Sequence, residues 1–113
     1  MVRPTLKEQV ISAYKKRLFF SSHAVEQMNL SQRMITTGDV RDIIEKGEII
    51  ERYLDDPRGP SCLIYGRTRE GRALHVVCAP KRDHLVVITA YTPSLIEWEK
   101  DLRARRRRGS RNR

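Results

Sequence analysis

Three polar side chains in this sequence could together carry acid–base chemistry on a phosphate ester: His75, Tyr91 and Arg72. His75 interrupts the apolar run Ala73-Leu74-His75-Val76-Val77, where an imidazole is costly to bury unless it has a hydrogen-bonding partner. Metal-independent cleavage of RNA needs groups that remove a proton from a 2′-hydroxyl, protonate the leaving oxygen and stabilise the phosphorane. Imidazole, phenol and guanidinium groups can fill these roles, and His23 is a fourth candidate catalytic residue.

Structural roles remain open for both histidines. His75 could be a buried histidine that is hydrogen-bonded to a hydroxyl or a carbonyl group, and His23 could pack between a helix and a sheet. An imidazole can also bind a metal ion, but no second histidine or cysteine lies at a spacing from His75 that would complete a metal site. We therefore expect no metal and no cofactor.

The distribution of positive charge suggests nucleic acid as a partner. The chain of 113 residues has a net charge of +9, and seven arginines lie in its last eleven residues, which contain no acid. The other 102 residues then carry only +2, so we interpret residues 103–113 as a basic and disordered tail behind a single domain, residues 1–102. Such a tail either attracts phosphates or only keeps the chain soluble. The candidate nucleic-acid-binding residues are Arg33, Arg67, Arg105, Arg106, Arg107 and Arg108.

The candidate catalytic residues are carried by a predicted antiparallel sheet. Residues rich in Val, Ile, Leu, Tyr and Thr predict strands at Glu48–Leu54, Ser61–Arg67, Arg72–Ala79 and His84–Tyr91. Turn-forming residues separate the last three strands, which favours a meander.

Helices are predicted on both sides of these strands in the sequence. Apolar stripes and capping residues predict helices at Leu6–Lys16 and His23–Leu30, and a third that begins near Thr36 and ends at Gly47. Ser94 and Glu97 form a capping-box pattern, which predicts a C-terminal helix. The predicted fold class is α+β, with N-terminal helices, a four-stranded antiparallel sheet and a C-terminal helix.

The pairing of the strands decides whether the candidate residues can act together. A two-residue turn at Glu70-Gly71 places Gly66 opposite His75, and a four-residue loop at Pro80–Asp83 places Tyr91 opposite Arg72. In that register Tyr91 and Arg72 lie on the sheet face away from His75. One β-bulge in either strand would bring Tyr91 onto the face of His75, because a shift of one residue exchanges the faces.

An ordered series of motifs carries a family resemblance. It comprises Ser22-His23-Ala24 with Met28, Gly47-Glu48-Ile49-Ile50, Gly71-Arg72-Ala73-Leu74-His75-Val76-Val77 and Ile88-Thr89-Ala90-Tyr91-Thr92-Pro93. The chain from about Phe19 to Arg107 resembles the DUF4258 family, whose members look like relatives of the RelE-type toxin superfamily, often paired with a small zinc-finger antitoxin. The resemblance implies a RelE-like fold, with a family core at about residues 19–102, and cleavage of mRNA by analogy. Gln27 departs from the family pattern, because an arginine usually precedes the methionine.

These observations together predict a cytoplasmic toxin of a toxin–antitoxin pair that acts as a metal-independent endoribonuclease. The sequence has no apolar run near the ~20 residues that span a bilayer, and its N-terminus lacks the apolar segment of a signal peptide. The expected partners are RNA, which includes ribosome-bound mRNA, and a small antitoxin protein of the zinc-finger type. The alternatives are a noncatalytic module that binds RNA or ribosomes, and a protein-interaction domain.

Overall fold

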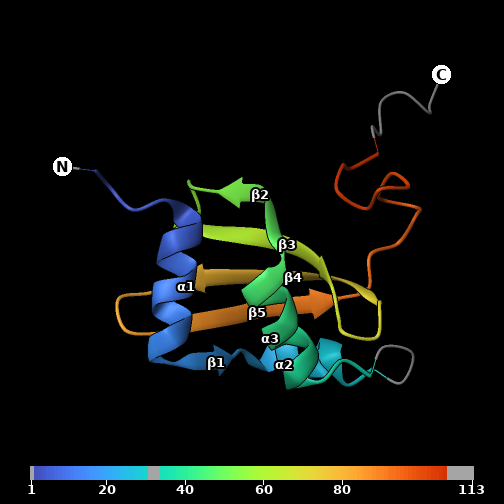
Figure 1. Ribbon diagram of the computed structural model, residues 1–113, viewed down its shortest axis with the longest axis horizontal. Coiled ribbons are helices and arrows are strands. Elements are labelled where there is room, and N and C mark those ends of the chain that lie inside the picture. Colours follow the sequence, from blue (N-terminus) through green and yellow to red (C-terminus); the bar gives the residue numbers. More distant parts are fainter. Residues whose placement is uncertain (1, 31–33, 107–113) are drawn as a thin grey trace.

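Three helices cover one face of a five-stranded mixed sheet (Figure 1). The computed structural model describes residues 2–30 and 34–106. The elements follow one another as α1 (Leu6–Lys16), β1 (Leu18–Phe20), α2 (Ser22–Met28), α3 (Thr37–Lys46), β2 (Glu48–Tyr53), β3 (Ser61–Arg67), β4 (Ala73–Pro80) and β5 (Leu85–Tyr91). In the sheet, the strands lie in the order β1-β5-β4-β3-β2.

Local capping signals define the helices. Thr5 and Thr36 each form a capping box, with Glu8 and Asp39 respectively, at the starts of α1 and α3. The predicted bounds of α1 are confirmed, and α3 ends before Gly47 as predicted. The second helix begins one residue earlier than predicted, because the side chain of Ser21 caps it by accepting a hydrogen bond from the Ala24 N–H.

The predicted four-stranded antiparallel sheet is wrong, because the chain has a fifth strand. Residues 18–20 form β1, which pairs in parallel with β5, with Leu18 opposite Leu85 and Phe19 opposite Val86. Three residues are too few to show an alternating pattern, so the sequence does not distinguish this strand from a short apolar connection. β1 forms only because the edge of β5, far along the chain, provides hydrogen-bonding partners.

The predicted C-terminal helix is also wrong. Residues 94–106 form turns and one isolated bridge, between Trp98 and Arg105. The Ser94 side chain accepts a hydrogen bond from the Ile96 N–H, and Trp98 is 1% exposed. Leu102 has a φ of 61°, which a helix does not allow. Tertiary packing of Trp98 therefore outweighs the local capping pattern.

The observed register differs from the predicted one at both hairpins. Tyr65, not Gly66, lies opposite His75, because the β3–β4 connection is longer than two residues and is closed by a hydrogen bond from Thr68 N–H to the Arg72 carbonyl. Between β4 and β5 the register shifts at Val77/Cys78. This bulge places Tyr91 opposite His75, and so on the face of the sheet that carries His75.

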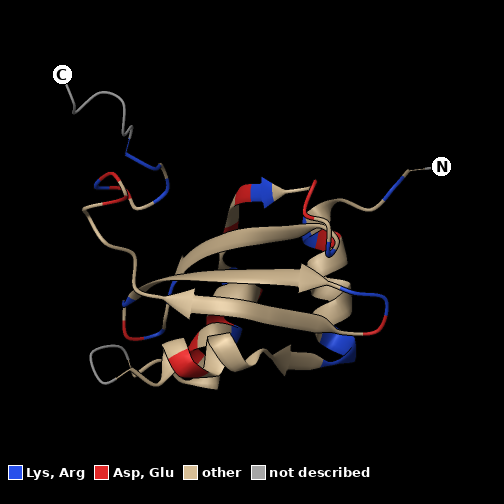
Figure 2. Cartoon of the chain, turned by 180° about the vertical axis from the view of Figure 1, so that it is seen from behind, with Lys and Arg blue, Asp and Glu red and all other residues tan. Residues whose placement is uncertain are grey.

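The two faces of the sheet have different surroundings. Leu74, Val76 and Cys78 face the helices and belong to the main core, together with apolar side chains of α1, α2 and α3. The other face carries His75 and, as Figure 2 shows, none of α1, α2 and α3 covers it over β3, β4 and β5. The irregular segment 94–106 reaches this face near the end of β5. Among the described residues, no helix has the length and apolar character needed to cross a membrane.

Candidate functional site

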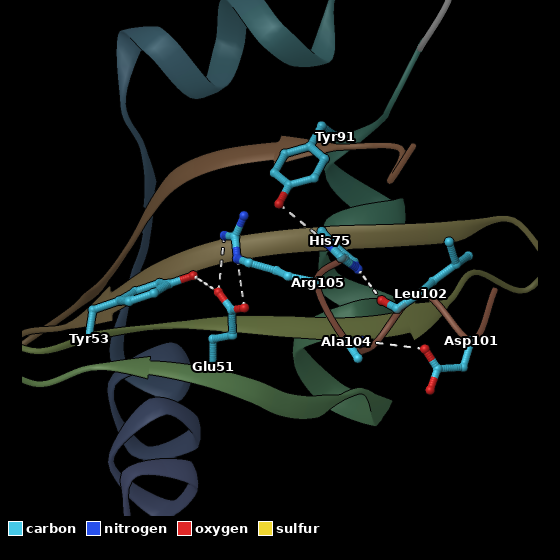
Figure 3. Close-up of polar contacts among 8 residues, drawn as sticks. All are labelled: Glu51, Tyr53, His75, Tyr91, Asp101, Leu102, Ala104 and Arg105. Carbon is cyan, nitrogen blue, oxygen red and sulfur yellow. Dashed lines mark hydrogen bonds and ion pairs between the residues drawn. The ribbon is translucent and has the colours of Figure 1, made fainter. Parts of the chain in front are cut away.

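His75 lies at the centre of a hydrogen-bonded group on the helix-free face (Figure 3). Its Nε2 lies 2.7 Å from the carbonyl oxygen of Leu102, and its Nδ1 lies 3.2 Å from the hydroxyl oxygen of Tyr91. A carbonyl oxygen can only accept, so Nε2 carries the proton and Nδ1 accepts a hydrogen bond from Tyr91. The Tyr91 hydroxyl is therefore oriented by the imidazole.

The surroundings of His75 keep the imidazole neutral. The side chain is 0% exposed, and three aromatic rings meet it edge-on, with Trp98 nearest at 4.4 Å between ring centroids. Burial lowers the pKa of His75, although the Leu102 carbonyl and the charge of Glu51 work in the opposite direction. A neutral ring that is sealed from solvent cannot touch a substrate while segment 94–106 covers it.

Beside this buried ring is an open groove of about 470 Å³. It lies between α2 and the end of β5, and residues 94–97 complete its wall. Its lining residues are His23, Gln27, Thr89, Tyr91, Thr92, Ser94, Ile96 and Glu97. Tyr91 belongs to both environments, because its hydroxyl contacts buried His75 while the residue lines the groove.

Arg72 reaches the rim of this groove. Its guanidinium donates hydrogen bonds to the Thr92 hydroxyl and to the Met34 carbonyl, both at 3.3 Å. The groove connects the four candidate catalytic residues, which come from separate parts of the sequence. His23 and Tyr91 line it, Arg72 donates a hydrogen bond to Thr92 of its lining, and buried His75 contacts the Tyr91 hydroxyl.

Residues 20–92 match the model of DUF4258, described as a domain of unknown function. The chain belongs to the DUF4258 family. Comparisons with curated proteins and with solved structures found no match. All four candidate catalytic residues lie within the DUF4258 domain, whereas segment 94–106, which covers His75, lies beyond its end.

Two arginines attach segment 94–106 to the DUF4258 domain. Arg103 pairs with Glu48 at 2.7 Å and lies over the ring of Tyr65. Arg105 pairs with Glu51 through two hydrogen bonds, at 2.8 and 3.1 Å, which are drawn at the centre of Figure 3. Its guanidinium also lies over the ring of Trp98. Both arginines therefore serve the intramolecular contact.

Glu51 and Tyr53 complete this polar cluster, and sequence reasoning did not identify Glu51. The Tyr53 hydroxyl donates a hydrogen bond to Glu51. Burial and that hydrogen bond raise the pKa of Tyr53 to about 12. Partial burial of Glu51 works to raise its pKa, but hydrogen bonds from Arg105 and Tyr53 outweigh it, so the pKa is lowered. No local signal joins Glu51 to an arginine 54 residues later.

The predicted nucleic-acid-binding arginines that the structure describes all have intramolecular partners. Arg67 donates to the Gly71 carbonyl at 2.8 Å, and Arg106 donates to the Leu95 carbonyl and to Glu99. Arg105 pairs with Glu51, as above. The other three predicted residues, Arg33, Arg107 and Arg108, lie outside the described residues. Within residues 2–30 and 34–106, no cluster of three or more His, Cys, Asp or Glu side chains could hold a metal ion.

Proposed function

We propose that this protein is a metal-independent endoribonuclease that acts on mRNA, as the toxin component of a type II toxin–antitoxin pair. The observation that carries the proposal is the contact between His75 Nδ1 and the hydroxyl of Tyr91, a residue that lines a groove together with His23. A phenol, an imidazole and, at the rim, the Arg72 guanidinium are the group types that RNA cleavage requires.

The proposed reaction is the attack of a 2′-hydroxyl on the adjacent phosphorus. The 2′-oxygen forms a bond to phosphorus, and the bond from phosphorus to the 5′-oxygen breaks. Tyr91 accepts the 2′-proton as its own proton moves to His75 Nδ1, and His23 acts as the general acid that gives a proton to the leaving 5′-oxygen. Arg72 stabilises the charge on the phosphorane. The products carry a 2′,3′-cyclic phosphate and a 5′-hydroxyl.

In this scheme His75 is a positioning residue and not a residue in contact with RNA. Its Nε2–H is held by the Leu102 carbonyl, which leaves Nδ1 as the acceptor for Tyr91. Burial disfavours the imidazolium that the proton transfer creates, whereas Glu51 and Leu102 favour it. Contacts of segment 94–106 would therefore tune the basicity of the Tyr91–His75 pair.

The partner and the cellular setting extend the same proposal. Resemblance to the RelE-like superfamily favours a small antitoxin of the zinc-finger type that holds the protein inactive in the cytoplasm. Growth arrest on induced expression, relieved by the product of the neighbouring gene, is the expected result in cells. Growth at the normal rate despite accumulation of the folded protein contradicts the toxin assignment.

Cleavage of RNA by the purified protein tests the enzyme directly. RNA should be cut in the presence of a metal chelator, with or without ribosomes, and the fragments should carry 5′-hydroxyl ends. Tyr91→Phe and His23→Gln should each lower the cleavage rate by about 100-fold or more, as expected for loss of a proton-transfer group. Tyr14→Phe is the matched control, because this tyrosine lies on α1 and donates to Glu45. Equal rates for all variants would reject the site.

One observation favours a noncatalytic RNA- or ribosome-binding module instead. His75 is 0% exposed and both of its ring nitrogens have hydrogen-bond partners, as in a histidine whose role is structural. This alternative predicts RNA binding by the wild type without any cleavage, with or without ribosomes.

A further inference from the structure

At the end of the sheet opposite the groove, an exposed aromatic ring lies beside an arginine. Phe19 of β1 is 45% exposed, and the Arg17 guanidinium lies 5.7 Å from the centre of its ring. The His84 ring meets Phe19 edge-on at 5.0 Å. Although Arg17 and His84 contact this ring, nearly half of its surface stays exposed at the sheet edge.

Two segments bring the surrounding cations together. Leu85 N–H donates to the Arg17 carbonyl at 2.8 Å, and Lys16 Nζ donates to the Arg82 carbonyl at 3.2 Å. The end of α1 thus lies against the turn between β4 and β5, which Figure 2 shows as neighbouring blue segments at the right of the sheet. The cations of this basic end are Lys15, Lys16, Arg17, Lys81 and Arg82.

Few carboxylates offset these charges. Asp83 belongs to the same turn, but it is hydrogen-bonded to His84 at 2.8 Å. Glu8 lines the groove between α1 and the turn, and it also caps the start of α1. Arg103 and Arg105 pair with Glu48 and Glu51. Within the part of the chain that the structure describes, no cation of the basic end forms an ion pair with a carboxylate.

The register connects the basic end to the groove. Phe19 lies opposite Val86, and Val86 alternates with the core residues Leu85 and Val87, so Phe19 shares the helix-free face with Tyr91. From Val86 to Tyr91 along β5 is about 17 Å, at roughly 3.4 Å per residue. Between them the helix-free face of β5 carries no charged residue.

We propose that single-stranded RNA stacks a base on Phe19, binds its phosphates to the cations of the basic end, and runs along β5 to the groove at Tyr91. Stacking on an aromatic ring next to a row of cations is the usual way in which proteins hold single strands without reading their sequence. The inference rests on the proposed function for its ligand, and it assigns the affinity to α1, β1 and the β4–β5 turn instead of the arginine-rich C-terminus.

The test is binding of a short fluorescent 2′-O-methyl RNA, which keeps bases and phosphates but cannot be cleaved by attack of its 2′-oxygen. Phe19→Leu should weaken binding by at least about five-fold, because it removes the stacking face. Phe19→Trp should preserve or improve affinity. Thermal unfolding of each variant checks that the half-exposed position tolerates the change.

Salt dependence tests the cations separately. Lys16→Gln combined with Arg82→Gln should reduce the slope of log affinity against log salt by about 1.4, at about 0.7 per phosphate contact on a single strand. Lys46→Gln combined with Lys100→Gln removes the same charge outside the basic end, and it should leave the slope nearly unchanged.

The outcomes separate this inference from the proposed function. RNA cleavage together with unchanged affinity of Phe19→Leu would overturn the inference and leave the enzyme standing. Phe19-dependent binding without cleavage by the wild type would support the inference and reject the enzyme. Failure of the wild type to bind the 2′-O-methyl RNA at low salt overturns the inference. The inference is also overturned if the protein self-associates, and Phe19→Leu abolishes this self-association but leaves the RNA affinity unchanged. In that case β1 would be a protein interface.

Discussion

The hydroxyl oxygen of Tyr91 lies 3.2 Å from Nδ1 of His75, although the regular alternation of β4 and β5 would have placed these side chains on opposite faces. The register shift at Val77/Cys78 produces the contact. Since the Leu102 carbonyl fixes the proton on Nε2, the direction of the Tyr91–His75 hydrogen bond is fixed too.

A double-mutant cycle on Tyr91 and His75 should show an energetic coupling. Tyr91→Phe leaves a buried Nδ1 without its donor, which should lower the free energy of unfolding by about 1–3 kcal/mol. The coupling energy with His75→Leu, from urea unfolding, should be about 1 kcal/mol. Tyr65→Phe is the control, because the ring that meets His75 edge-on is retained. Additive effects for Tyr91 and His75 would contradict the hydrogen bond.

Burial of neutral His75 should make stability depend on pH. Its pKa is lowered from 6.5 in the folded protein, so below that pH the unfolded chain binds a proton that the folded chain excludes. The free energy of unfolding should therefore be highest above pH 6.5 and fall on acidification toward the lowered folded pKa. Urea unfolding from about pH 8 to about pH 5 measures this slope, before most carboxylates titrate. In His75→Gln the slope over this window should be smaller; an unchanged slope would show that other groups cause it.

Trp98 should control access to His75. Trp98→Ala removes the ring that lies closest to the imidazole, so segment 94–106 should detach and His75 should become reactive toward diethyl pyrocarbonate. A buried Trp→Ala change typically costs about 3–5 kcal/mol, whereas the ion pairs of Arg103 and Arg105 are largely exposed to solvent and contribute little to holding the segment. Ile96→Ala, at an 80% exposed position of the same segment, should leave His75 protected. Protection in both variants would mean that the segment does not depend on Trp98.

Gly47 should not tolerate a side chain. A Cβ at Gly47 would lie 2.6 Å from the carbonyl oxygens of Ile43 and Tyr65, which are backbone atoms. Gly47→Ala should therefore lower the free energy of unfolding by at least about 2 kcal/mol. In contrast, Gly38→Ala, at an exposed position of α3, meets only an ordinary contact at 3.6 Å and should stabilise the protein by up to about 1 kcal/mol. Thermal unfolding that ranks the two variants in the reverse order would contradict the close packing at Gly47.

Glu97 should weaken RNA binding in the groove. Its exposed carboxylate lines the same surface as His23 and Tyr91, where it repels phosphate. Glu97→Gln should tighten binding of 2′-O-methyl RNA by about two-fold at low salt, and the gain should vanish at high salt. Glu70→Gln removes an equal charge from another groove and is the matched control. An equal gain from Glu70→Gln would indicate an effect of net charge and not of the groove.

The sequence by itself determined the helices and the strands whose signals are local. Thr5, Thr36 and Gly47 mark the ends of α1 and α3, and segments rich in Val, Ile, Leu, Tyr and Thr between turn-forming residues mark β3, β4 and β5. It also singled out His75, because a polar side chain in an apolar run requires a partner, and Tyr91, Arg72 and His23, because RNA cleavage uses their types of group. Capping and composition act over a few residues, so they can be seen without knowledge of the fold.

Only the tertiary structure decided how these parts meet. β1 exists because β5 offers an edge to Phe19 and its neighbours, and the expected C-terminal helix is absent because Trp98 packs against His75. The bulge at Val77/Cys78 brought Tyr91 to His75, and Arg105 found Glu51 across 54 residues. Such pairings depend on contacts between segments that are distant in the chain, and a one-residue difference in register changes the face on which a side chain lies.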